Sequence, residues 1–332
     1  MVQKCKLRYD NPYFIYNVVK NHLVIYPILK LFVRLAVNIF CGEILIHNHR
    51  ALNTKGPLLI TANHPNSFFD AVIIGALFKE PVHFLARGDA FKKPWHNALL
   101  KTLNMIPIYR LSEGKENLHL NEKTFQISQD ILSKGGIVLI FIEGLCVQEY
   151  GLRPFKKGAA RIALNCYNDN IPLKILPLGI NYSDFRKVGM YVEVHPGKLL
   201  HPDEIFREKD TASNLLAFNN SVHQELEKLV WQENKNRRPG KNYWIVLFAF
   251  SGTIIHAPFY YPVKSFVAKK TKGTVFYHAV LFGILLFTYP LFVGLVSLLL
   301  IAAGVNKLLA LSVFIVLPLL AYAAVQQKKY SY

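Results

Sequence analysis

The residues with the clearest chemical potential lie in one short segment, Asn63-His64-Pro65-Asn66-Ser67-Phe68-Phe69-Asp70. An apolar, strand-like run precedes this segment and a helix-compatible run follows it, so its side chains project from the end of a sheet. A neutral His64 imidazole there can take a proton from a hydroxyl, while the Asp70 carboxylate holds its tautomer and stabilises the imidazolium. The alternative is a turn histidine followed by an acid at a helix N-terminus.

Two further segments place polar side chains at strand ends. Arg110 ends the run Ile106-Pro107-Ile108-Tyr109-Arg110 and can hold a phosphate through two parallel hydrogen bonds. Glu143 and Gly144 leave the apolar run GGIVLIFI, where the glycine allows close approach of the backbone. A solvated arginine at a strand end is the simpler interpretation of Arg110 alone.

Basic residues follow the third segment. Arg153, Lys156 and Lys157 precede a predicted helix, GAARIALNCYN, whose N-terminus would also favour an anion. For any single lysine, an ordinary basic loop is the simpler explanation. The run Ile175–Gly179 is interpreted as a buried strand with a packing role.

The elements that must position these residues alternate along 42–235. Strand-like runs lie near 43–49, 57–64, 81–87, 105–110, 135–144, 172–182 and 188–197, and helical runs lie between several of them. Apolar strands alternating with helices predict an α/β sheet flanked by helices on both faces.

The two ends of the chain have a different composition. Residues 1–41 predict N-terminal membrane-associated helices over 13–40, because cations interrupt the apolar run. The alternative is an ordinary helix pair packed on the following domain. After a polar linker, residues 276–303 and 308–325 predict a transmembrane hairpin with cytosolic outer ends. Residues 244–263 contain Pro258 and Pro262, so we expect an interfacial or re-entrant segment there.

Composition narrows the class of protein. Half of the 332 residues are hydrophobic, and 39 Lys and Arg outnumber 21 Asp and Glu. Such a balance favours anionic lipids or phosphorylated substrates. Nucleic acid is not expected as a partner, because no zinc-finger, RNP or basic-zipper pattern occurs. The four scattered cysteines predict reduced thiols, and no metal site is expected.

Taken in order, these segments resemble the glycerolipid acyltransferase family, which includes glycerol-3-phosphate and 1-acylglycerol-3-phosphate acyltransferases. Members carry an Asn-His…Asp block, a strand ending in Arg, a Phe-Pro-Glu-Gly block and a Pro-containing strand. The resemblance covers about residues 45–185. It implies an α/β domain at a membrane surface, His64 as general base and Asp70 as its orienting partner. It also implies an acceptor-binding group, namely Asn63, Arg110, Glu143, Gly144, Arg153, Lys156 and Lys157.

The sequence departs from the family pattern at two places. Both departures bear on the identity of the acceptor more than on the class of reaction. Five residues separate His64 from Asp70 here, whereas the family has four, and we expect the extra residue to bulge. The Glu-Gly block normally has Pro before Glu and Thr-Arg after Gly; Ile142, Leu145 and Cys146 occupy those positions. Arg153 is a candidate substitute for the missing arginine.

The resemblance implies transfer of a fatty acyl group from acyl-CoA or acyl carrier protein to glycerol 3-phosphate or 1-acylglycerol 3-phosphate. The donor is a co-substrate, and no further cofactor is expected. Acylation of another lipid acceptor, transacylation between phospholipids and a non-catalytic membrane scaffold remain alternatives. We expect an integral membrane protein whose catalytic domain lies on the cytoplasmic face and contacts anionic lipids.

Overall fold

The computed structural model describes residues 27–110, 114, 119–208, 210–233 and 243–328. A seven-stranded sheet lies at its centre, in the order β1-β7-β6-β2-β5-β3-β4. The strands are β1 (Glu43–Ile46), β2 (Leu58–Ala62), β3 (Val82–Arg87), β4 (Met105–Ile108), β5 (Ile137–Phe141), β6 (Lys174–Tyr182) and β7 (Tyr191–Pro196).

Five neighbouring strands run in one direction. β2 pairs in parallel with both β5 and β6, and β3 pairs in parallel with β5 and β4. β7 is antiparallel to β6 and carries β1 beside it in parallel. The carboxyl ends of β2 to β6 therefore meet at one edge of the sheet, the usual place for ligands in open α/β sheets.

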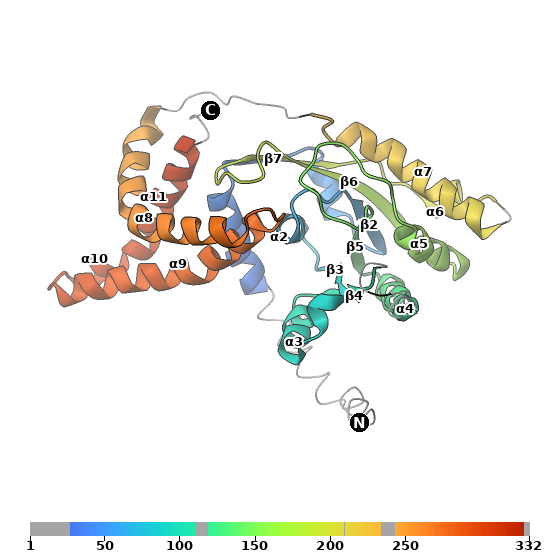
Figure 1. Ribbon diagram of the computed structural model, residues 1–332, viewed down its shortest axis with the longest axis horizontal. Helices are drawn as coiled ribbons and strands as arrows, with labels where there is room; N and C mark the ends of the chain where they lie inside the picture. Colours follow the sequence, from blue (N-terminus) through green and yellow to red (C-terminus); the bar gives the residue numbers. More distant parts are fainter. Residues whose placement is uncertain (1–26, 111–113, 115–118, 209, 234–242, 329–332) are drawn as a thin grey trace.

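Helices cover both faces of the sheet, as the sequence predicts (Figure 1). Along β2 the side chains alternate: Leu58 and Ile60 pack on one face, and Leu59 on the other. The domain helices are α2 (Phe68–Leu77), α3 (Pro94–Thr102), α4 (Leu120–Ser133), α5 (Gly158–Asn168), α6 (Pro202–Ile205) and α7 (Thr211–Leu229), with 3-10 helices η2 (His49–Asn53) and η3 (Gly88–Phe91). Buried residues of α2 belong to the first face, and those of α4, α5 and α7 to the second.

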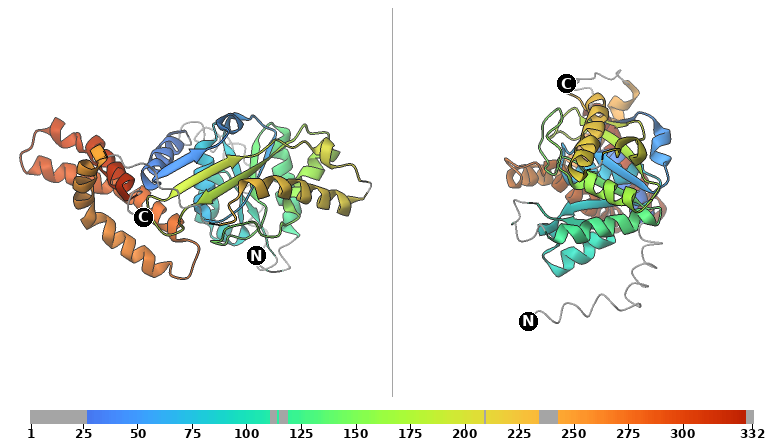
Figure 2. Two further views of the ribbon diagram at one scale, coloured as in Figure 1. Left: turned by 90° about the horizontal axis from the view of Figure 1, so that it is seen from above. Right: turned by 90° about the vertical axis from the view of Figure 1, so that its right-hand side faces the viewer.

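The C-terminal helices are α8 (Tyr243–Lys270), α9 (Tyr277–Ala302), α10 (Lys307–Leu311) and α11 (Val313–Lys328). Figure 2 shows them gathered at one end of the molecule, with α7 toward the other end. Within the described residues, three helical stretches are long and apolar enough to cross a membrane by length and composition: Val246–Lys270, Tyr277–Ala302 and Lys307–Gln327. These helices indicate membrane association.

A helical hairpin lies where the sequence predicts one, with α9 on one side and α10 and α11 on the other. The turn after α9 contains Gly304, whose φ is +82°, and the Asn306 side chain accepts from the Leu308 N–H at the start of α10. The start of α9 and the end of α11 return to the sheet domain. His278 of α9 contacts the loop after β2, and the Gln326 side chain donates to the Gly42 carbonyl at 2.7 Å.

The segment 244–263, expected to be interfacial or re-entrant, is helical throughout, and its position relative to a membrane stays a prediction. α8 is one continuous helix with Pro258 and Pro262 inside it, and Figure 1 shows it changing direction along its length. Each proline removes one backbone donor and bends a helix without having to end it. α8 packs closely on α11 at Gly252. The approach is so close that a Cβ added to Gly252 would lie 2.2 Å from the Leu320 carbonyl oxygen.

The N-terminal prediction is only partly covered by the structure. Residues 27–40 are helical, whereas 1–26 lie outside the described residues. Val37 and Phe40 are buried in the core with α2 and α9, while Ile28, Leu31 and Leu35 are exposed. The apolar exposed side fits the predicted membrane association of this helix.

Candidate active site

The loop between β2 and α2 brings His64 and Asp70 together. Nδ1 of His64 lies 2.8 Å from Oδ2 of Asp70, within the hydrogen-bond range predicted from the sequence, so the predicted contact is confirmed. Because a carboxylate oxygen accepts, the proton of this bond is on Nδ1 and the other ring nitrogen, Nε2, keeps its lone pair. His64 is partly exposed, and its ring stacks on Phe141 at a centroid distance of 3.8 Å.

Asp70 is fully buried and accepts hydrogen bonds on both oxygens. The Asn66 backbone N–H donates to Oδ2 at 2.8 Å, and the Tyr182 hydroxyl donates to Oδ1 at 2.7 Å. Burial, with the neighbouring Asp70 charge, raises the pKa of Tyr182 well above its ordinary value, so the phenol remains a donor. A buried carboxylate is tolerated when such donors replace its water.

Within the His–Asp segment, Ser67 adopts φ +56° and ψ −144°. A non-glycine residue in such a conformation carries strain on the order of 1–3 kcal/mol and requires surroundings that hold it. The Ser67 N–H donates to Cys146 Sγ at 2.9 Å, and the preceding Asn66 side chain contacts His278 Nδ1 at 2.9 Å. The loop is therefore anchored from two distant segments, and the expected bulge stays a prediction.

Glu143 is buried directly after β5. Its burial, partly offset by a hydrogen bond from the Arg153 backbone N–H and reinforced by the Asp70 charge, raises the pKa of Glu143 to about 7. A group with such a pKa exchanges its proton near neutrality, which is frequent in active sites.

Gly144 lies under the side chain of Lys156. Its φ is +66°, and a Cβ there would lie 2.8 Å from Lys156 Cγ, so both conformation and space favour glycine. Arg110 donates from Nη1 to the Gly144 carbonyl at 3.2 Å, which places the predicted arginine beside the Glu-Gly block.

The remaining predicted residues have different surroundings. Asn63 is fully engaged with β6: its Nδ2 donates to the Ile180 carbonyl and its Oδ1 accepts from the Ile180 N–H. Arg153 pairs with Glu149 at 2.8 Å on the surface. Lys156 and Lys157 are exposed at the start of α5. A substrate-binding role for these residues stays a prediction, and Asn63 additionally ties β2 to β6.

Cys146 occupies the position where the family pattern has arginine. Burial first, and then the Asp70 charge, raise the pKa of the Cys146 thiol to about 12. The thiol is therefore neutral at physiological pH and unsuited to nucleophilic attack. The Cys146 sulfur instead accepts a hydrogen bond from the Ser67 N–H.

A group with metal-ligating side chains lies elsewhere in the domain. Among the described residues, ligand atoms of His47, Glu193 and His195 lie within 4.8 Å of one another, beside β1 and β7. The two imidazole rings stack at 3.9 Å, and Glu193 is engaged by Tyr191 and His195. Stacked rings do not aim their lone pairs at a common ion, so we interpret the group as a hydrogen-bonded cluster.

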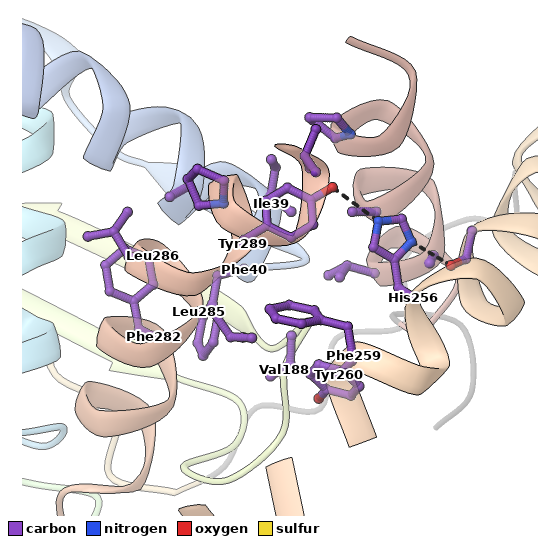
Figure 3. A pocket seen from close by; sticks show the side chains of 18 of the residues that line it. Ile39, Phe40, Val188, His256, Phe259, Tyr260, Phe282, Leu285, Leu286 and Tyr289 are labelled. Atoms are coloured by element: carbon purple, nitrogen blue, oxygen red, sulfur yellow. Dashed lines mark hydrogen bonds between the residues drawn. The ribbon is translucent and has the colours of Figure 1, made fainter. Parts of the chain in front are cut away.

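A cavity of about 390 Å³ lies between the N-terminal helix and α8, α9 and α11 (Figure 3). Its lining is mainly apolar and includes Phe40, Phe259 and Phe282. His256 donates from Nδ1 to the Gly252 carbonyl and accepts at Nε2 from the Tyr289 hydroxyl. None of the predicted catalytic or substrate-binding residues lines this cavity.

Comparison with known proteins assigns the central part of the chain. Residues 43–181 match the family model described as Acyltransferase, so this segment is an acyltransferase domain. The fold, a mixed α/β sheet flanked by helices, is the one predicted.

Two curated proteins resemble the chain in sequence. It is 25% identical over 183 residues to a probable 1-acyl-sn-glycerol-3-phosphate acyltransferase of Mycoplasma pneumoniae, covering 54% of this chain and 65% of that protein. A protein of the same description from Mycoplasma genitalium is 25% identical over 126 residues, covering 37% of this chain and 45% of that protein. The chain thus spans about two thirds or less of the length of these relatives.

A solved structure is also similar. The 1-acyl-sn-glycerophosphate acyltransferase PlsC from Thermotoga maritima superposes with a TM-score of 0.42 at 15% identity, covering 65% of this chain and 91% of that chain.

Proposed function

We propose that this protein transfers a fatty acyl group from acyl-CoA or acyl carrier protein to the hydroxyl of glycerol 3-phosphate or 1-acylglycerol 3-phosphate. The observation that carries the proposal is the His64–Asp70 hydrogen bond at the carboxyl edge of the sheet, inside the segment that matches the acyltransferase family. The descriptions of the two Mycoplasma proteins support a phosphorylated glycerolipid acceptor.

In the proposed reaction His64 is the general base. Nε2 of the ring removes the proton of the acceptor hydroxyl as its oxygen attacks the thioester carbonyl carbon. The Asp70 carboxylate stabilises the imidazolium that forms. The tetrahedral intermediate then expels the thiolate, which takes the proton back from His64, leaving an ester and a free thiol. This route requires no metal ion or prosthetic group.

The acceptor phosphate is proposed to meet the basic rim formed by Arg110, Arg153, Lys156 and Lys157. Arg110 lies beside the Glu-Gly block, and the two lysines precede the N-terminus of α5, which adds a favourable dipole. Glu143 is proposed to contact the acceptor beside this rim.

A different lipid acceptor, including another phospholipid in a transacylation, is the second candidate. The observation that favours it is Cys146, a neutral thiol bonded to the Ser67 N–H at the position of the family's phosphate-site arginine. One cation is thereby missing from the acceptor pocket unless Arg153 replaces it.

We propose that the catalytic domain faces the cytoplasm. Lysines are frequent before α9, at 264, 269, 270 and 272, and favour a cytosolic position for that end. The same end of α9 contacts the catalytic loop, so the domain lies on the same side.

The test is an acceptor screen with full-length protein in membranes. Labelled acyl-CoA or acyl carrier protein is supplied with glycerol 3-phosphate, 1-acylglycerol 3-phosphate or a neutral lysolipid, and His64→Ala serves as the matched inactive variant. Product with a phosphorylated acceptor, absent from the variant, is the expected result. Product only with a neutral or phosphodiester acceptor would favour the second candidate. No product with any acceptor would overturn both.

A further inference from the structure

Helix α9 contacts the loop between β2 and α2, which carries His64 and Asp70, through one buried pair of polar side chains. Nδ1 of His278, in the first turn of α9, lies 2.9 Å from Nδ2 of Asn66, and both side chains are completely buried. Figure 1 shows the start of α9 beside α2. His278 is outside the residues that match the acyltransferase family model, 43–181.

The direction of this hydrogen bond is determined by the second contact of His278. Its Nε2 lies 3.2 Å from the Lys187 carbonyl, which can only accept, so Nε2 carries the ring proton. In the neutral ring, Nδ1 then accepts from the Asn66 amide. The contact thus joins the loop after β2 to the β6–β7 connection through α9.

The His278 ring is also held by aromatic neighbours. The ring of Phe40 meets it edge-on at 5.7 Å, and that of Phe69 lies at 5.9 Å. With both nitrogens bonded and two rings packed against it, the side chain has a single position.

Asn66 connects this contact to the catalytic pair. Its backbone N–H donates to the same Asp70 oxygen that receives the His64 Nδ1–H. Its own Oδ1 has no hydrogen-bond partner among the described residues, so His278 is the side chain that orients the Asn66 amide. The next residue, Ser67, is in a strained conformation, with φ +56° and ψ −144°.

We infer that His278 is a positioning residue of the catalytic loop, which holds Asn66 so that the backbone of that residue keeps Asp70 against His64. A strained loop keeps its shape only while its surroundings fix it, and His278 supplies one of the two anchors. Docking of the first turn of α9 on the domain therefore helps to hold the catalytic pair together. The kinetic part of this inference rests on the proposed acyl transfer.

The test compares His278→Leu, which cannot accept the Asn66 hydrogen bond, with His278→Gln, whose amide oxygen can. Leu281→Ala is the matched control: it lies one turn further along α9, is fully buried in the apolar core and has no polar contact with the loop. Full-length variants are assayed for kcat, for KM of the acyl donor and for thermal stability.

We expect His278→Leu to lower kcat roughly ten- to a hundredfold, as a misplaced catalytic group does, with the donor KM nearly unchanged. His278→Gln should recover most of the loss, while Leu281→Ala should lower stability and spare kcat. Asn66→Ala should resemble His278→Leu, and the double variant should be no slower than either single one. Wild-type kcat in His278→Leu, equal losses for Leu and Gln, or additive losses would overturn the inference.

A second readout does not depend on turnover. 15N spectra of histidine-labelled protein report which ring nitrogen of His64 carries the proton, with its signals assigned by their loss in His64→Gln. The Nδ1-protonated form should dominate in the wild type and in His278→Gln, and should mix with the other tautomer in His278→Leu. An unchanged tautomer in His278→Leu would contradict the inference. Absence of acyl transfer by the wild type would instead contradict the proposed function.

Discussion

The Tyr182 hydroxyl, at the end of β6, donates to Oδ1 of Asp70 at 2.7 Å and completes the shell of that buried carboxylate. The opposite oxygen is bonded to His64 and to the Asn66 N–H. Asp70 is thus fixed from β6 and from its own loop, so the imidazole can adopt one orientation. Removing the charge of Asp70 and removing the hydroxyl of Tyr182 should therefore have effects of different size.

We expect Asp70→Asn to lower turnover by about a thousandfold or more, because the amide neither stabilises the imidazolium nor selects the tautomer. Tyr182→Phe keeps the charge and loses one hydrogen bond, so its loss should be nearer tenfold. The two are compared by kcat in membranes with equal amounts of folded protein. Similar losses in both variants would contradict the separate roles, as would full activity of Asp70→Asn.

Glu143 leads to a prediction about pH and stability. Its pKa is raised to about 7 from an ordinary value of 4.5, mainly by burial. Between these values the folded state binds the proton more tightly than the unfolded state, so stability falls as the pH rises from about 4.5 to 7. At higher pH the full cost of the buried charge is present.

Glu143→Gln removes this cost. The variant should melt several degrees above the wild type at pH 8, and the difference should shrink toward zero at pH 5. Thermal unfolding followed at both pH values in one detergent checks the prediction, with Glu227→Gln, a change in an exposed carboxylate of α7, as control. A gain of the same size at both pH values would show that the charge of Glu143 is not the cause.

The raised pKa of Cys146, about 12, predicts that its sulfur takes no covalent part in the reaction. Cys146→Ser retains an acceptor for the Ser67 N–H, so its turnover should fall by less than about tenfold, whereas loss of a nucleophile costs several orders of magnitude. Activity should also survive iodoacetamide at pH 7.5. Inactivation by the reagent together with a dead serine variant would indicate an acyl-cysteine intermediate.

The hairpin gives a prediction of topology. Single cysteines at positions 272 and 306, in a background without native cysteines, are labelled from outside intact cells with an impermeant maleimide. Position 306 should react and position 272 should react only after permeabilisation, because lysines favour the cytosolic side. Labelling of 272 alone in intact cells would place the catalytic domain outside the cytoplasm.

Local patterns predicted the sheet, and the resemblance to the acyltransferase family was needed to assign His64 and Asp70 their roles. The alternation of apolar runs and helices indicated the strand ends, and since parallel strands share an edge, His64, Arg110 and Glu143 were expected near it. The predicted His64–Asp70 contact is confirmed, and the bulge stays a prediction. These features depend on residues close in sequence or on a shared strand direction.

The partners contributed by distant segments could not be predicted. Tyr182 and His278 lie 112 and 212 residues from their partners in the loop, and no local pattern encodes such pairings. For Tyr182, the sequence shows only that a tyrosine ends a predicted strand, and this does not indicate which side chain its hydroxyl contacts. The two prolines of 244–263 gave no sign that the helix continues through them, because proline can bend a helix without ending it.

The central claim is that His64 is the base of an acyl transfer to a phosphorylated glycerolipid, and His64→Ala tests it most directly. Full-length wild type and variant, matched for membrane-bound folded protein, are given labelled acyl-CoA or acyl carrier protein and 1-acylglycerol 3-phosphate. We predict that the wild type forms the diacyl product and that the variant is slower by roughly a hundredfold or more. Near-normal turnover by the variant would contradict the account.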